Sequence, residues 1–257
     1  MCLILLAYRA HPDTAVLLAG NRDEFYHRPS APPAQICDDP PIFAGRDLEA
    51  GGTWMGRNGA GMLAALTNGR RFDQVVPPNP RSRGELVTGL LRQSSAAAAA
   101  DWLTAQPLER FRPFNVLFGD VEAFYYYSSL EGRPVAALAP GMYALSNSTL
   151  NDSTWPKVAF SLGFLRDNAG TPGEELLRRV QRFLCDGTPP DQERSDDLSE
   201  EVHGALGAVF IRTANYGTVS QTILTEGGTL GRRYYFSPET HLQQGPRPVP
   251  AFRRLPF

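Results

Sequence analysis

Strand-like segments occur in three blocks along this chain, and two pairs of helical segments separate the blocks. The strand-like runs are apolar and end at clusters of glycine, proline, asparagine or aspartate, as strands do. The helical segments carry apolar residues at helical spacing. This order predicts two sheets lying between two helical layers. We expect the 257 residues to form one domain, residues 1–257, because domains of this type commonly reach that size.

The first block is expected to hold two hairpins, and the second hairpin turns at Asn58 and Gly59, where Gly59 can adopt positive φ. Ser82 and Glu85 have capping-box spacing, which predicts a helix from about Arg83. The predicted strands are 2–8, 15–19, 53–57, 61–67, 114–120, 123–128, 134–138, 142–146, 208–213, 218–224 and 232–236. The other predicted helices run through the alanine-rich stretch to residue 105 and over 155–167 and 174–185.

Three segments lack such patterns. Prolines in residues 29–41 predict a long irregular loop. Residues 186–201 are acidic and contain proline, which indicates a solvated linker. The chain from about residue 238 is a proline-rich tail with no clear pattern.

Composition excludes several classes of partner and compartment. A net charge of −2 gives no field that would attract nucleic acid or an anionic membrane. Three widely spaced cysteines, Cys2, Cys37 and Cys185, form neither a disulfide framework nor a metal-ligand pair, and they suit a reducing compartment. The apolar run at residues 3–8 is too short to target or span a membrane. We therefore expect a cytoplasmic protein without stable membrane insertion.

Motif spacing argues against three common kinds of site. The glycines of residues 56–61 read G-x-x-G-x-G between two strand patterns, whereas a dinucleotide motif requires a helix to follow. The four histidines are far apart, which disfavours a structural metal. No G-x-S-x-G nucleophile elbow occurs.

Cys2 is the strongest candidate for chemistry, although a cysteine beside an apolar strand is usually inert packing. Removal of Met1 would make Cys2 the terminus, with a thiol and an α-amine that both titrate near neutral pH. One residue could then supply nucleophile and base. If the first two strands pair, Arg22 and Asp23 lie near Cys2, where Arg22 could stabilise a thiolate and Asp23 could hold the α-ammonium.

Two asparagines follow predicted strands, a position that turn chemistry alone could also explain. Asn68 ends the strand at 61–67, and Asn147 ends the strand at 142–146. Acyl transfer needs neutral donors aimed at the developing oxyanion. We assign Asn68 the oxyanion role and Asn147 substrate orientation.

Several motifs resemble those of the NRDE protein family, also called the transport and Golgi organisation family. They are the Met-Cys start, Asn21 to Glu24, GGTWMG at residues 51–56, and Asn68 and Asn147 with their neighbours. That family is similar to Ntn hydrolases of the choloylglycine hydrolase and penicillin V acylase type. The resemblance implies an α+β, four-layer αββα sandwich with two mainly antiparallel sheets, and a catalytic set of Cys2, Arg22, Asp23, Asn68 and Asn147. The acylases carry a further arginine in their C-terminal part, and we leave this role unassigned, whether to Arg212, Arg232, Arg233 or none of them.

The expected activity is hydrolysis of a small-molecule amide or acyl (thio)ester through a Cys2 acyl-enzyme, without a cofactor. The alternative is a non-catalytic carrier on the same fold that binds haem or an acyl-CoA or lipid, with Cys2 as an iron ligand or unused. A third possibility is a scaffold in which Cys2 is no more reactive than Cys37.

Overall fold

The computed structural model describes residues 2–70, 77–188, 207–238 and 252–257. Its strands form two sheets in which all neighbours are antiparallel. Sheet A has the order β10-β1-β2-β11-β12-β13. Its strands are β1 (Leu3–His11), β2 (Thr14–Phe25), β10 (Gly141–Leu145), β11 (Tyr216–Glu226), β12 (Arg233–Pro238) and β13 (Arg253–Leu255).

Sheet B follows the chain order from β3 to β9. Its strands are β3 (Ser30–Asp38), β4 (Pro41–Asp47), β5 (Met55–Asn58), β6 (Leu63–Asn68), β7 (Phe114–Gly119), β8 (Phe124–Ser128) and β9 (Ala136–Ala137). Sheet A therefore combines segments from distant parts of the chain, whereas each strand of sheet B pairs with the next strand of that sheet along the chain.

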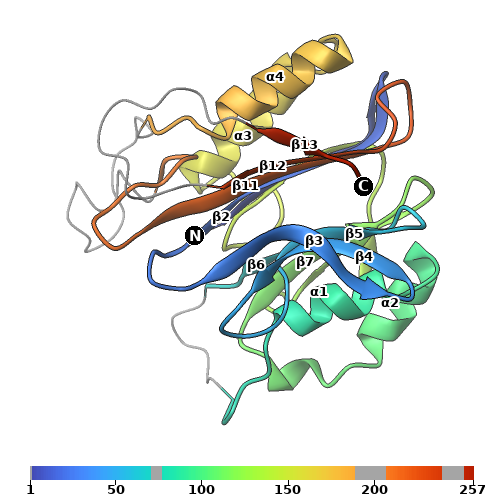
Figure 1. The fold of residues 1–257 in the computed structure, drawn as a ribbon, viewed down its shortest axis with the longest axis vertical. Coiled ribbons are helices and arrows are strands. Elements are labelled where there is room, and N and C mark those ends of the chain that lie inside the picture. The colour runs from blue at the N-terminus through green and yellow to red at the C-terminus, as the bar shows by residue number, and fades with distance from the viewer. Residues whose placement is uncertain (1, 71–76, 189–206, 239–251) are drawn as a thin grey trace.

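Helices cover the outer face of each sheet, so the molecule has four layers in the order α, β, β, α (Figure 1). Sheet A carries α3 (Pro156–Asp167) and α4 (Gly173–Phe183), and sheet B carries α1 (Gly84–Leu91) and α2 (Ala96–Thr104). A single 3-10 turn, Leu108–Arg110, follows α2. The expected αββα sandwich is confirmed.

The alternation of side chains in β1 explains how a strand serves two cores. Leu3 and Leu5 pack toward α3 and α4, while Ile4 and Leu6 pack into the core between the sheets. Successive strand residues point to opposite faces, so a continuous apolar run is what a strand buried on both faces requires. The short apolar run at the chain start is therefore a central strand of the sandwich.

Most predicted elements are observed, but residues 29–41 are not an irregular loop. They form β3 and the start of β4, a hairpin at the end of sheet B. Pro32 and Pro33 lie at a register shift in β3, which is an edge strand. Edge strands and bulges tolerate proline because no ladder hydrogen bond is needed there. The prolines therefore marked an edge strand.

Smaller predictions also fail. Residues 208–213 form no strand and contribute only a bridge between Arg212 and Gly217. The capping box is absent, because α1 has Arg83 at its N-cap without a side-chain bond and Glu85 pairs with Arg81. Positive φ occurs at Gly61, not at Gly59.

Two of the patternless segments lie mostly outside the described residues. The acidic linker falls largely within residues 189–206, and most of the proline-rich tail falls within 239–251. The last described part of that tail forms β13, which pairs with β12. The expectation of a patternless tail is therefore wrong at residues 253–255.

Candidate functional site

The candidate residues meet where three neighbouring strands of sheet A end. Leu3 pairs with Asn21 and Ile4 pairs with Leu145. Extending both registers places Cys2 between Arg22 of β2 and Asn147, just beyond β10. A hydrogen bond from Ser146 Oγ to the Cys2 carbonyl, 3.0 Å long, fixes this edge. Strand pairing thus assembles residues that are far apart in the sequence.

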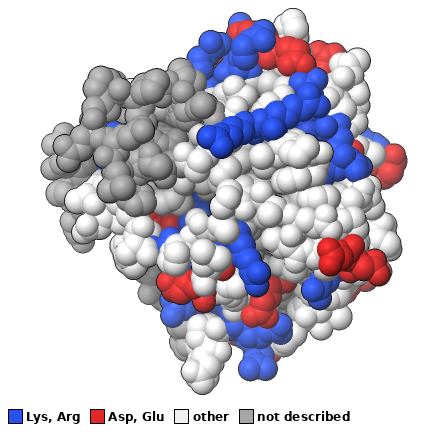
Figure 2. Space-filling model, viewed as in Figure 1, with Lys and Arg blue, Asp and Glu red and all other residues white. Residues whose placement is uncertain are grey.

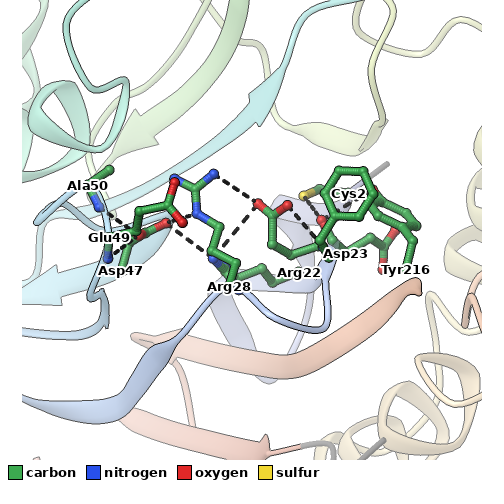
Figure 3. A network of polar contacts seen from close by, with 10 residues as sticks. Cys2, Arg22, Asp23, Arg28, Asp47, Glu49, Ala50 and Tyr216 are labelled. Carbon is green, nitrogen blue, oxygen red and sulfur yellow. Dashed lines mark hydrogen bonds and ion pairs between the residues drawn. The ribbon is translucent and has the colours of Figure 1, made fainter.

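Cys2 is half-buried, and its Sγ lies 3.8 Å from the backbone oxygen of Asp23 (Figure 3). The Tyr216 hydroxyl donates to the same oxygen over 3.2 Å. Burial raises the pKa of the Cys2 thiol and the Asp23 carboxylate adds to that rise, whereas the Arg22 guanidinium lowers it. The resting group is therefore a thiol, which needs a base to become a nucleophile.

Arg22 faces the space between the sheets, where it is almost fully buried. Its Nη2 lies 3.2 Å from Asp47 Oδ2, and its guanidinium stacks 4.6 Å from the Trp54 ring centroid. Arg28 also pairs with Asp47, at 3.0 Å, as Figure 3 shows. Nη1 of Arg22 is buried and has no hydrogen-bond partner among the described residues. The arginine is held in place on one side and keeps a donor on the other.

The Asp23 carboxylate points the opposite way, toward the helical layer, because neighbouring residues of β2 face opposite sides. Its Oδ1 accepts a 2.7 Å hydrogen bond from Thr218 Oγ1 of β11. Burial raises the pKa of this carboxyl, and the Lys157 ammonium and the Thr218 hydroxyl act against that rise. The backbone oxygen of Asp23 thus contacts the Cys2 sulfur, while its carboxylate contacts Thr218 and Lys157.

Lys157, in the first turn of α3, is a site residue that the sequence reasoning missed. Its Nζ lies 3.8 Å from Asp23 Oδ2, its side chain is 1% exposed, and Nζ has no hydrogen-bond partner among the described residues. Burial lowers the pKa of Lys157, while Asp23 and Cys2 oppose that shift. The signal was available, since Lys157 is the one lysine among 25 basic residues. In a chain whose basic residues are otherwise all arginine, the single lysine is a stronger functional signal than any one arginine.

Asn147 and Asn68 join the two sheets beside Cys2. Asn147 Nδ2 donates to the Asn68 carbonyl over 2.7 Å, which uses one of its two amide hydrogens. The Asn68 side chain is exposed and has no hydrogen bond to the described residues. Thr67 Oγ1 donates to the Ser146 carbonyl over 2.6 Å and strengthens the same junction. The strand register therefore places Asn147 next to Cys2. Asn68 joins the site through its backbone carbonyl, which accepts the hydrogen bond from Asn147.

The three candidate C-terminal arginines lie in different places. Arg232 pairs with Glu226, and Arg233 pairs with Glu174 and lies opposite Thr225. Thr225 is seven residues along β11 from Thr218, a separation of about 23 Å. Arg212 bridges to Gly217, beside Thr218, and is exposed. Of the three, only Arg212 lies at the Cys2 end of sheet A.

The described residues contain no group of three or more His, Cys, Asp or Glu side chains able to hold a metal ion. Within the same residues, none of the helices is both long and apolar enough to cross a membrane. The polar groups around Cys2 are instead hydrogen-bond donors and charges. Such a set suits chemistry that a thiol performs with neighbouring amides and cations.

Sequence comparison identifies the family. The sequence profile of the Transport and Golgi organisation 2 family matches residues 1–230. The chain belongs to this family. Its relatives include the Transport and Golgi organization 2 homologue of Mus musculus, 31% identical over 87% of this chain and 88% of the relative. The homologue of Homo sapiens is also 31% identical with the same coverages. An uncharacterized protein of Saccharomyces cerevisiae, YGR127W, is 33% identical over 68% of this chain and 57% of its own length.

Solved structures extend the comparison of this family member at the level of fold. A variant of conjugated bile acid hydrolase from Clostridium perfringens superposes with a TM-score of 0.57 and 9% identity, covering 99% of this chain and 92% of that chain. The Caenorhabditis elegans orthologue of N-acylethanolamine-hydrolyzing acid amidase superposes with a TM-score of 0.53 and 10% identity, covering 87% of this chain and 92% of that chain. At these identities the likeness establishes the Ntn-hydrolase fold alone.

Proposed function

We propose that this protein is an N-terminal-cysteine hydrolase that cleaves an amide or acyl (thio)ester bond through an acyl-enzyme on Cys2. The observation that carries the proposal is the position of Cys2, at the edge of a central strand with Arg22 and Asn147 on its two sides. A thiol flanked by a cation and a neutral amide has the parts that acyl transfer uses. The family membership and the fold are compatible with this chemistry.

The reaction begins when the α-amine of Cys2, exposed by loss of Met1, takes the thiol proton. The sulfur attacks the substrate carbonyl, the C–S bond forms, and the carbonyl electrons move to oxygen. The second Nδ2 hydrogen of Asn147 and the buried Nη1 of Arg22 are the donors proposed for this oxyanion. The oxyanion role thus moves from Asn68 to Asn147, because the side chain of Asn68 is exposed. Collapse breaks the bond to the leaving amine or thiol, which receives the proton from the α-ammonium. Water then hydrolyses the thioester, with the amine again acting as base.

Asp23 and Lys157 are proposed to set the protonation state of the α-amine. Asp23 accepts a hydrogen bond from the ammonium form, while the Lys157 charge, 3.8 Å from Asp23, disfavours a second cation nearby. The two effects oppose one another and bring the amine into the range where a base works at neutral pH. Lys157 acts through Asp23, so it is a positioning residue.

An apolar acyl group is the substrate feature that the surroundings favour. Among the described residues the large exposed hydrophobic side chains are Phe25, Leu48 and Phe160. Phe25 follows Asp23 by two residues and packs edge-on against Tyr216, and Leu48 follows Asp47 directly. Apolar side chains exposed near a reactive group are typical of a binding groove for an apolar ligand.

The test is turnover by the full-length protein lacking Met1, assayed on a panel of N-acyl amides and acyl thioesters of increasing chain length. We expect hydrolysis that increases with chain length and is lost in Cys2→Ala, with an acyl adduct on Cys2 detected by mass spectrometry. Cys37→Ala is the matched control and should retain full turnover. Full turnover by Cys2→Ala would refute the proposal.

Binding without cleavage is the alternative, with haem or an acyl-CoA as the ligand. Absorbance titration with haem, repeated on Cys2→Ala, distinguishes it from hydrolysis. Saturable binding that depends on Cys2, together with no turnover on the panel, would favour the carrier.

A further inference from the structure

A second site lies at the opposite end of the sandwich from Cys2. An open cavity of about 660 Å³ is lined by residues of β4, β5, the turn between β11 and β12, and the C-terminal segment: Phe43, Arg57, Arg232, Arg254, Leu255, Pro256 and Phe257. Glu226, which pairs with Arg57, is eight residues along β11 from Thr218, a separation of about 27 Å. The cavity is therefore distinct from the Cys2 site.

Arg57 is the central feature of this cavity. Its side chain is 1% exposed, and Nη2 lies 3.2 Å from Glu226 Oε2. Nη1 is buried and has no hydrogen-bond partner among the described residues. Burial lowers the pKa of Arg57 to about 10, with the Arg232 charge adding to the effect. The group therefore stays protonated at neutral pH and keeps one donor without an acceptor, which is costly for a buried cation.

The surrounding charges leave the cavity positive. Arg232 Nε lies 3.1 Å from both oxygens of Glu226, and its Nη1 donates to the Gly59 carbonyl over 2.6 Å. Glu226 thus serves two arginines, and Arg254 adds a third cation to the lining. Figure 2 shows a band of basic side chains across this part of the molecule, where β13 runs in Figure 1, next to a broad uncharged surface. An anion would balance the excess.

The remaining walls are aromatic and aliphatic. Phe43 stacks on Phe257 with centroids 4.6 Å apart, and Phe257 meets the edge of Tyr234 at 5.6 Å. Leu255 and Pro256 complete this side. The cavity therefore offers cations and rings side by side, since Phe43 lies directly opposite Arg57 in the pairing of β4 and β5. Such a lining fits a ligand that has a charged head and a flat apolar body.

We infer that this cavity binds an organic anion, with a carboxylate or phosphate head against Arg57 and Arg232 and an apolar body against Phe43 and Phe257. The inference does not depend on the activity of Cys2. The two head groups share the same recognition chemistry, because a guanidinium donates in a fork to either one.

The test is calorimetric titration of the full-length protein with naphthyl phosphate, naphthoate, naphthol and inorganic phosphate. We expect one saturable site for at least one naphthyl anion. Naphthol lacks the charged head and inorganic phosphate lacks the apolar body, so each should bind at least about tenfold more weakly. Whether the phosphate or the carboxylate binds more tightly identifies the head group.

Neighbouring arginines provide the matched variants. Arg232→Gln should weaken binding about fivefold or more, through loss of one charged donor at the cavity. Arg233 pairs with Glu174 instead. Arg233→Gln should therefore change the affinity for the naphthyl anion by less than about twofold. Cys2→Ala should bind as wild type. Equal loss in both arginine variants, loss in Cys2→Ala, or no saturable binding of either naphthyl anion would overturn the inference.

Discussion

At the scale of single residues, Lys157 and Asp23 form a buried ion pair beside the Cys2 site. Two opposite charges 3.8 Å apart lie in a region where both side chains are at most 1% exposed. Burying such a pair gains little net stability, but removing Lys157 takes away one of the groups that compensate the buried Asp23 charge. The pair is therefore expected to matter more for the protonation state of the site than for holding α3 in place.

Lys157→Met should lower the free energy of unfolding by at most about 3–5 kcal/mol at pH 7, because Thr218 still contacts the Asp23 carboxylate, and by less at pH 5. Without the ammonium, the pKa of Asp23, already raised by burial, rises further in the folded state. Between the pKa of an aspartate in the unfolded chain, about 3.9, and the higher pKa of Asp23 in the folded variant, the folded state binds more protons than the unfolded state. The free energy of unfolding therefore falls as pH rises through this range. Urea unfolding at both pH values measures the difference. An equal loss at pH 5 and pH 7 would contradict it, and the double variant with Asp23→Asn should recover part of the stability.

Asn147 connects stability and chemistry at one residue. Asn147→Ala removes the 2.7 Å hydrogen bond to the Asn68 carbonyl, so stability should fall by about 1 kcal/mol. If Asn147 also donates to the oxyanion, kcat should fall by about 10²–10³. Turnover and urea unfolding of the same preparation separate the two effects. Asn68→Ala, whose exposed side chain has no hydrogen bond to the described residues, is the control for stability. Unchanged kcat in Asn147→Ala would remove it from the catalytic set.

At the scale of elements, the close pairing of β1 and β2 aligns Cys2 with Arg22. Gly20 lies opposite Ile4 in this pairing. A Cβ at Gly20 would come 2.6 Å from the Leu3 carbonyl oxygen and 3.0 Å from Met55 Cε. The carbonyl belongs to the strand backbone, so the contact cannot be relieved by rotating a side chain.

Gly20→Ala should therefore destabilise the protein by about 1–3 kcal/mol and lower turnover together with stability. Gly163→Ala in α3 is the matched control. A Cβ there meets no atom within 4 Å, so alanine should be neutral or stabilising by up to about 1 kcal/mol. Thermal unfolding of the two variants provides the comparison. A Gly20→Ala protein as stable as wild type would show that the strands can separate without cost.

Element types were predictable where apolar periodicity was strong, as in β1 and α4. The β3–β4 hairpin was missed because local proline chemistry says nothing of a strand's place at the edge of a sheet. For the site, the sequence placed Cys2 beside Arg22 through hairpin pairing. It did not reveal Lys157, because the approach of α3 to Asp23 is set by packing between layers. Thr218 was missed for the same reason, since β11 enters the sheet from a distant part of the chain.

At the scale of the whole molecule, the core between the sheets joins the two halves of the sandwich. Ile4 and Leu6 of sheet A pack there with Leu63 and Leu117 of sheet B. All four side chains are at most 2% exposed. Each sheet buries its inner face only against the other sheet, so neither half keeps its core alone.

The protein should therefore unfold in a single cooperative transition, with equal calorimetric and van't Hoff enthalpies. Leu117→Ala should lower the midpoint of that one transition, consistent with a loss of about 2–5 kcal/mol for a buried leucine. Differential scanning calorimetry of both proteins makes the measurement. Two resolved transitions, or a variant that shifts only part of the heat absorption, would show that the sheets unfold separately.

The most direct test of the role of Cys2 is peptide mass spectrometry after brief exposure of the native protein to limiting alkylating reagent. Cys2, Cys37 and Cys185 are all half-buried, so exposure alone predicts similar labelling. Activation by a terminal amine and by Arg22 predicts loss of Met1 and label concentrated on Cys2. Retained Met1, or label spread evenly over the three cysteines, would contradict an N-terminal nucleophile.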